Sequence, residues 1–256
     1  GVQTCALPIP ARNDAERFWV KNLEAKLAQA QASVEAKTRE IARLEAMLQE
    51  RDALLARAEA EKAAAQADLE AGSTACRDLG LPFHLDGARA WNALRTTGED
   101  WTRYGRRFDS ISLCLSKGLG TPVGSVLLGR RAFIEEAHRS RKVMGGGMRQ
   151  VGILAAAGLH AIEHHFDRLE EDHRRAAAIG ERLEANGAVA SVASVETNIV
   201  IASLPEGRAA GEMVEHFASH GVLCSAFGPD KVRWVTHLDF GEADLARVLA
   251  AVDTWS

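Results

Sequence analysis

Apolar positions recur at a regular spacing in the first part of the chain. Between Val20 and Leu69 they alternate three and four residues apart, and no glycine or proline interrupts the segment. This spacing predicts one long helix with a single apolar seam. Lys37, Arg51 and Lys62 fall on the seam and weaken it. Two interpretations stay open: a coiled-coil dimerisation helix, or a solvated, alanine-rich helix whose seam has no specific partner.

The pattern changes after this helix. Gly72, Ser73 and Thr74 are expected to end it and to mark a domain boundary near residue 72. Short apolar runs then alternate with helical patterns, which is typical of an α/β chain. The runs expected to form strands are Leu81–Leu85, Ile111–Leu115, Ser125–Leu128, Val189–Val192, Ile199–Ala202, Val222–Ser225 and Val232–Thr236. The expected helices are Ala88–Arg95, Arg131–Arg141, Arg149–Ala185 with a possible break, Ala209–His220 and Glu242–Thr254.

Composition narrows the class of partner. The chain has 256 residues, a formal net charge of -4 and a pI near 6.2, so nothing supports a sequence-independent grip on nucleic acid or on an anionic membrane. Its longest mostly apolar stretch, residues 151–162, is too short to span a bilayer. The expected partners are small molecules or other protein chains. Four cysteines lie far apart, which favours a reducing, cytoplasmic setting over a disulfide framework or a zinc site.

The first residues differ in character from the rest. The chain does not begin with methionine, and no basic region followed by an apolar core marks a secretory signal. The opening GVQTCALPI is similar to a translated sequencing adapter. Residues 1–9 are therefore expected to be a sequence artefact that takes no part in the fold.

Two charged residues stand at the ends of predicted strands. In FHLDGARAWNA the strand period of two puts His84 and Asp86 on one face, with Asp86 at the carboxyl end. Lys117, in LCLSKGLGTPVG, follows the next apolar run. Arg89, one helical turn beyond Asp86, could reach the same ligand. Each of the three residues has an ordinary alternative: Asp86 caps the helix beginning at Gly87, Lys117 is a solvated turn lysine, and Arg89 is a surface residue. Together, a lysine that forms an imine and a carboxylate that keeps a pyridine nitrogen protonated are what pyridoxal phosphate requires.

Four long blocks, all in the same order, carry a resemblance to a known family. They are LPFHLDGARAWNA, LCLSKGLGTPVGSVLLG, RKVMGGGMRQVGILAAAGLHAIEHHFDRLEEDH and VRWVTHLD. They resemble low-specificity L-threonine aldolases of the aromatic amino acid β-eliminating lyase/threonine aldolase family, from about Ala75 to Ser256. The resemblance implies a fold-type-I, aminotransferase-like α/β fold and a pyridoxal 5′-phosphate cofactor.

The resemblance also implies roles for single residues around the cofactor. Lys117 would be the Schiff-base lysine, and Asp86 would be the partner of the pyridine nitrogen. Arg149, in GGGMRQ, would meet the cofactor phosphate, and Lys142 is a weaker candidate for the same role.

On the substrate side, the resemblance implies that Arg89 contacts the cofactor or the substrate and that Arg233 holds the substrate carboxylate. The implied reaction is retro-aldol cleavage of L-threonine, L-allo-threonine and other β-hydroxy-α-amino acids to glycine and an aldehyde, in a homo-oligomer. A planar guanidinium suits a carboxylate because it can donate two parallel hydrogen bonds, although an arginine on a strand is more often solvated. No residue is assigned as the catalytic base.

The first 75 residues depart from the family pattern, which normally has there a glycine-containing phosphate loop and a histidine that stacks on the cofactor. The expected architecture is a coiled-coil helix (10–72), a partial cofactor-binding large domain (73–148), and a linking helix with a small α/β domain (149–256). Impaired activity is expected. The alternatives are a non-catalytic coiled-coil scaffold with a remnant α/β domain, or another fold-type-I lyase or racemase.

Two polar stretches are given no chemical role. HAIEH, from His160 to His164, matches the H-x-x-E-H pattern of some zinc peptidases, but a third ligand is not identified and the pattern is short. A place on a helix surface or at an interface is favoured instead. The run FDRLEEDHRR, residues 166–175, is expected to be a solvated helix face.

Overall fold

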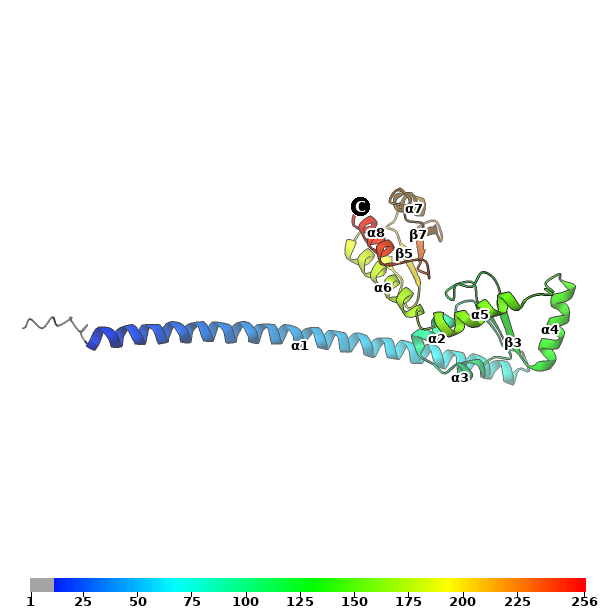
Figure 1. The fold of residues 1–256 in the computed structure, drawn as a ribbon, viewed down its shortest axis with the longest axis horizontal. Helices are drawn as coiled ribbons and strands as arrows, with labels where there is room; N and C mark the ends of the chain where they lie inside the picture. The colour runs from blue at the N-terminus through cyan, green and yellow to red at the C-terminus, as the bar shows by residue number, and fades with distance from the viewer. Residues whose placement is uncertain (1–11) are drawn as a thin grey trace, which may run out of the picture. The chain divides into compact units, whose positions relative to one another are not determined.

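The computed structural model describes residues 12–256 (Figure 1). The expectation of an artefact over residues 1–9, like Cys5 and the first two residues of the predicted helix, lies outside this range. The chain divides into two compact units, with the division between Gln66 and Ala67. Among the helices of residues 12–256, none has the continuous apolar length that a bilayer-spanning segment requires.

The long helix predicted from the heptad spacing is present as α1 (Arg12–Asp78). In the first unit its apolar seam is open to solvent, and Leu23, Leu27, Val34, Ile41, Leu44, Leu48 and Leu55 are each 49–64% exposed. The prediction that the helix ends at Gly72 is wrong, because α1 continues to Asp78. Buried contacts override the weak helix preference of glycine and serine there: Ser73 donates to the Arg107 carbonyl at 2.7 Å, and Glu70 pairs with the Arg107 side chain at 2.8 Å.

The second unit begins with a small sheet, and residues 84–165 are called the three-stranded region below. β1 (His84–Gly87) pairs in parallel with β2 (Ser110–Cys114), and β3 (Ser125–Gly129) runs antiparallel to β2. Helices α2 (Ala90–Thr97) and α3 (Trp101–Gly105) connect β1 to β2. Helices α4 (Arg131–Val143) and α5 (Gly152–His165) follow β3.

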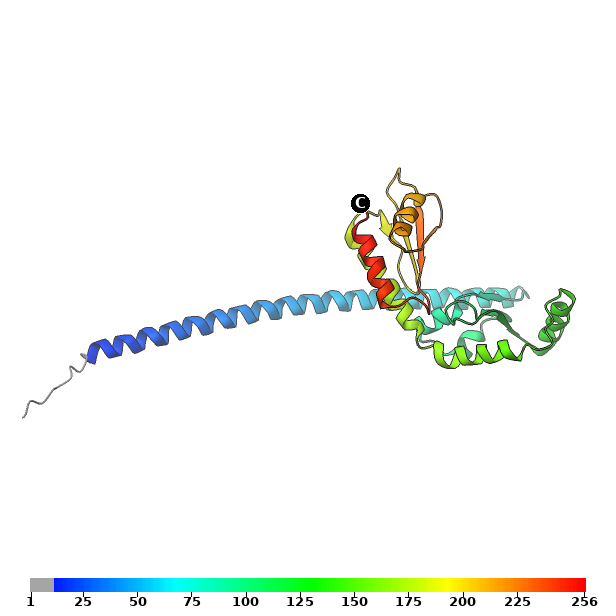
Figure 2. The same ribbon diagram turned by 45° about the horizontal axis from the view of Figure 1, so that its top comes forward.

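The remaining residues, 169–256, form a C-terminal domain. Helix α6 (Leu169–Asn186) leads into β4 (Ser191–Val192) and β5 (Ile199–Ser203), and α7 (Ala210–Ser219) leads into β6 (Ser225–Ala226) and β7 (Lys231–Val235). The four strands form an antiparallel sheet in the order β4-β5-β7-β6. Helix α8 (Glu242–Asp253) packs along α6, as both views show (Figures 1 and 2).

The two parts of this unit differ in how much apolar surface they bury. The core of the C-terminal domain includes Ile179, Leu183, Val200, Met213, Phe217, Val232 and Val252, all at most 1% exposed. The core of the three-stranded region is small and consists of Trp91, Leu115, Leu119 and Ala161, joined by Leu169 from the start of α6. Val126, Leu127 and Leu128 of β3 are 38–42% exposed. Val126 and Leu127 line an open cleft of about 620 Å³, together with Ile134, Met148 and Leu154.

Most predicted elements are found with shifted ends. The predicted strand Val222–Ser225 is mostly wrong, because the Val222 N–H donates to the Phe217 carbonyl in the turn after α7 and β6 begins only at Ser225. The possible break in the predicted helix over 149–185 is confirmed, since residues 166–168 form a turn between α5 and α6. The pattern does not predict α3, which has five residues and no room for an apolar period. Its one local signal is Asp100, whose side chain accepts from the Arg103 N–H at 2.8 Å as an N-cap.

Candidate active site

Strand β1 presents Asp86 at the edge of the three-stranded sheet. His84 and Asp86 share its exposed face, as the period of two predicts, while Gly87 is buried. A Cβ at Gly87 would lie 2.8 Å from the Ser112 carbonyl oxygen, so β1 and β2 are in close contact where β1 ends. The alternative that Asp86 caps the next helix is wrong, because α2 begins only at Ala90 and its N-cap is Arg89, without a side-chain hydrogen bond.

Lys117 lies in a closed loop that follows β2. The Leu115 N–H donates to the Gly124 carbonyl at 3.0 Å, and the Gly120 N–H donates to the Lys117 carbonyl at 2.9 Å. The Lys117 side chain is exposed, whereas the next two residues, Gly118 and Leu119, are buried. Because β1 and β2 are neighbouring parallel strands, their carboxyl ends bring Asp86 and the Lys117 loop to the same edge of the sheet.

Arg89 and Arg233 come close enough to influence each other, although they are 144 positions apart in the chain. Burial lowers the pKa of Arg89, the positive charge of Arg233 lowers it further, and Cys114 at the end of β2 opposes the shift. The Nε atoms of both arginines are buried without a hydrogen-bond partner. Among the described residues neither guanidinium pairs with a carboxylate. The pair is therefore a positive spot suited to an anion, above all to a carboxylate.

The two residues predicted to meet a phosphate are placed differently. Lys142 lies in the last turn of α4, and Arg149 lies in the connection between α4 and α5. Both side chains are exposed. No ion pair in the described part of the chain involves either residue, and no described contact links them to Lys117 or Asp86.

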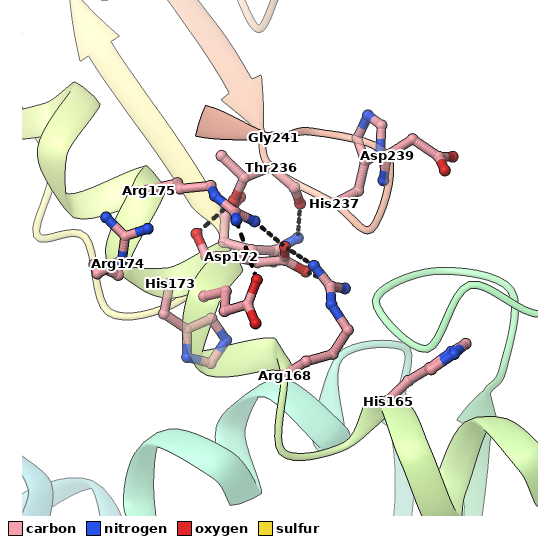
Figure 3. Close-up of polar contacts among 12 residues, drawn as sticks. His165, Arg168, Asp172, His173, Arg174, Arg175, Thr236, His237, Asp239 and Gly241 are labelled. Atoms are coloured by element: carbon pink, nitrogen blue, oxygen red, sulfur yellow. Dashed lines mark hydrogen bonds and ion pairs between the residues drawn. The ribbon is translucent and has the colours of Figure 1, made fainter. Parts of the chain in front are cut away.

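A buried ionic cluster joins the start of α6 to the end of β7 (Figure 3). Asp172 is fully buried and pairs with Arg168 at 2.9 Å, and its carbonyl accepts from the Thr236 hydroxyl at 2.7 Å. Arg175, also buried, pairs with Glu242 at 2.9 Å. Burial raises the pKa of Asp172, although Arg168, Arg175 and His237 oppose this shift.

This cluster corrects one expectation from the sequence. The run of residues 166–175 is not a uniformly solvated helix face, since Asp172 is 0% and Arg175 8% exposed. Alternating charges alone do not reveal which side of a helix faces another element. Here the face that carries Asp172 packs against Thr236, directly after the end of β7. Arg233 lies three residues before Thr236, within β7.

Further polar contacts join α2 to α6, and no pattern in the sequence predicts them. The buried Asn92 amide donates to His173 Nε2 at 3.0 Å, so His173 Nδ1 carries the proton toward the Thr96 hydroxyl at 3.2 Å. Burial lowers the pKa of His173, and the charge of Arg95 lowers it further. His165, at the end of α5, lies 2.7 Å through Nδ1 from the Leu119 carbonyl.

The HAIEH stretch forms part of α5. The His160 and His164 rings are 4.4 Å apart between centroids, and His164 lies 4.0 Å from Glu163. No group of three or more histidine, cysteine or acidic side chains that could hold a metal ion occurs within residues 12–256.

Comparison with solved structures defines the fold class. A putative L-allo-threonine aldolase from Listeria monocytogenes superposes with a TM-score of 0.59 at 20% identity, covering 73% of this chain and 56% of that one. The threonine aldolase of Leishmania major gives a TM-score of 0.57 at 21% identity, covering 72% and 54%. An N-acetylornithine aminotransferase from Stenotrophomonas maltophilia gives 0.52 at 22% identity, covering 70% and 48%. The fold is thus the fold-type-I, aminotransferase-like α/β fold that the resemblance implies.

Sequence comparison identifies the family. The model of the beta-eliminating lyase family matches residues 28–206, and the chain belongs to this family. The low specificity L-threonine aldolase of Escherichia coli K12 is 45% identical over 174 residues, which are 68% of this chain and 51% of that protein. The probable low-specificity L-threonine aldolase 2 of Arabidopsis thaliana is 40% identical over 177 residues, 68% and 50%. The chain spans about half the length of the curated relatives it matches.

Proposed function

We propose that this chain carries the lysine-bearing part of a pyridoxal-phosphate-dependent lyase. Its substrates would be L-threonine, L-allo-threonine and other β-hydroxy-α-amino acids, cleaved by retro-aldol chemistry to glycine and an aldehyde. The observation that carries the proposal is the pair of arginines, Arg89 and Arg233, whose buried Nε atoms lack partners. The aldolase names of the relatives support the choice of reaction.

The two arginines suit an α-carboxylate. Burial is the main cause of the lowered pKa of Arg89, the positive charge of Arg233 lowers it further, and an anion between the two guanidinium groups would offset this repulsion. A carboxylate would also accept hydrogen bonds from donors that otherwise stay buried and unpaired. We assign the substrate carboxylate to Arg233, and contact with the substrate or the cofactor to Arg89.

The sheet edge suits the reactive part of the cofactor. Lys117 offers an exposed amine on a loop whose next two residues, Gly118 and Leu119, are buried. This amine would hold pyridoxal phosphate covalently. Asp86, on the exposed face of β1, would hold the proton of the pyridine nitrogen by its negative charge. When bound, the cofactor supplies the electron sink for bond cleavage at the substrate Cα. We place the phosphate near Arg149, with Lys142 as a second candidate, on the resemblance alone.

Covalent trapping tests the assignment of Lys117. The chain is incubated with pyridoxal 5′-phosphate, reduced with borohydride, digested and mapped by mass spectrometry. The pyridoxyl group is expected on Lys117, and Lys117→Arg should lose it, whereas Lys231→Arg, an exposed lysine of β7, should keep it. Asp86→Asn should keep the label but slow the release of acetaldehyde from L-threonine. A label spread over other lysines in the unaltered chain contradicts the proposal.

We further propose that α1 forms a coiled coil that joins copies of the chain. Its exposed leucine seam supports this, because such a seam gains stability only when another helix covers it. In sedimentation equilibrium the full chain should be a dimer or larger, as should Glu45→Lys, which lies off the seam. Replacing both Leu27 and Leu44 with Glu should lower the mass. A concentration-independent monomer in the unaltered chain contradicts the coiled coil and leaves a solvated helix.

We also propose that the chain works in the cytoplasm. We propose in addition that its domains are the three predicted segments 10–72, 73–148 and 149–256. Cys76, Cys114 and Cys224 are free thiols, which agrees with a reducing compartment. Burial raises the pKa of Cys224 to about 11, so this thiol is poorly reactive at neutral pH.

A further inference from the structure

The loop that carries Lys117 is packed into the protein at the next two residues, Gly118 and Leu119. The Leu119 side chain is 1% exposed and packs in the small core with Trp91, Leu115 and Leu169. Gly118 fits tightly, since an added Cβ would lie 2.8 Å from Leu169 and 3.1 Å from the side-chain oxygen of Asn92. Packing therefore fixes the chain just beyond Lys117, while the lysine itself stays exposed.

His165 supplies the polar part of this support. Its Nδ1 lies 2.7 Å from the Leu119 carbonyl oxygen, and because a carbonyl only accepts, Nδ1 must carry the proton. His165 is the last residue of α5, close in sequence to Arg168 of the ionic cluster (Figure 3). It thus ties the Lys117 loop to the turn that leads into α6. Its neighbour His164 is exposed and makes no contact of this kind among the described residues.

We propose that His165 is a positioning residue for Lys117, which its Nδ1–H holds in place through the Leu119 carbonyl. The inference rests on the proposed function of Lys117, but the anchoring itself does not. Without the donor, a carbonyl at a buried residue would lose its partner, and the loop would open to satisfy it with water. The amine would then sample many orientations, and covalent capture of the cofactor would slow.

Hydrogen exchange measured on the full chain without cofactor tests the anchor. His165→Leu keeps the apolar bulk but removes the donor, whereas His165→Asn places an amide nitrogen as many bonds from Cα as Nδ1. His164→Leu is the matched control on the same helix. His165→Leu should speed exchange in a peptide covering residues 115–121 by about tenfold, His165→Asn should restore most of the protection, and His164→Leu should change nothing. Unchanged exchange in His165→Leu, or an equal rise in His164→Leu, overturns the anchor.

The rate of borohydride-trapped labelling of Lys117 by pyridoxal 5′-phosphate tests the positioning role. His165→Leu should slow labelling about tenfold, His165→Asn should recover it, and Lys117 should remain the labelled residue. If exchange rises but labelling does not slow, His165 is only structural and the proposal fails. If the unaltered chain takes no label, the proposed function of Lys117 fails, and the exchange results still decide whether His165 anchors the loop.

Discussion

In the C-terminal domain, the sheet β4-β5-β7-β6 is covered by helices and its central strands alternate buried and partly buried residues. In the three-stranded region, every residue of β3 is exposed although Val126, Leu127 and Leu128 are apolar. The sheet of the C-terminal domain meets the usual requirement that an apolar face be covered, whereas strand β3 of the three-stranded region does not. Stability is thus concentrated in the domain that holds Arg233, while Lys117 and Asp86 lie in the less buried region.

The largest expected effect concerns this exposed sheet. If the proposed function holds, replacing residues 1–75 with the part of the Escherichia coli relative that the match leaves uncovered should raise acetaldehyde release from L-threonine by about 100-fold or more, because packing around β1 and β3 would hold Lys117 and Asp86 in place. Purified unaltered and fused chains are assayed with excess cofactor. Comparable high activity in both would show that the sheet needs no further cover.

A core truncation measures the contrast directly. Phe217→Ala should lower the free energy of unfolding by about 3–5 kcal/mol, since the ring is fully buried beside Trp234. Leu127→Ala on β3 should cost less than about 1 kcal/mol, because the side chain is already 38% exposed. Urea unfolding followed by tryptophan fluorescence compares the two. Equal losses would mean that β3 is covered in solution.

The ionic cluster predicts an intermediate effect. Arg168→Leu should lower the free energy of unfolding by about 3 kcal/mol, because it leaves the fully buried Asp172 carboxylate with Arg175 at 3.8 Å as its remaining cation. Asp172→Asn should cost less, since a neutral amide is less costly to bury. The same urea titrations test this, and a larger loss in Asp172→Asn would contradict it.

The smallest effect is a pH dependence from His173. Its pKa is lowered in the folded state by burial and by Arg95, so near and below about pH 6.5 the unfolded chain binds more protons than the folded one. The free energy of unfolding should therefore fall as the pH decreases from 7 toward 5. His173→Gln should reduce this slope, whereas the exposed His138→Gln should not. Identical slopes in all three chains would exclude His173 as the cause.

Local patterns predicted the elements of this fold better than their contacts. The alternation along β1 predicts the exposed face on which Asp86 lies, and the helical pattern over residues 149–185 indicates a break, which the structure has between α5 and α6. The end of α1 and the burial of Asp172 cannot be predicted in this way, because both depend on residues far away in sequence, Arg107 and Thr236. The proximity of Arg89 and Arg233 likewise followed from resemblance rather than spacing. His165 gave no signal because its partner is a backbone carbonyl 46 residues away.

Helix α6 takes part in both cores: Leu169 at its first turn packs with Trp91, while Ile179 and Leu183 pack in the C-terminal domain. An 18-residue helix is about 27 Å long, so α6 reaches from one core into the other. Its first two turns are also bound to α2, because His173 accepts from the Asn92 amide and Glu170 pairs with Arg95. Any shift of the domain that carries Arg233 against the Lys117 loop would therefore have to break these contacts as well as the packing of Leu169.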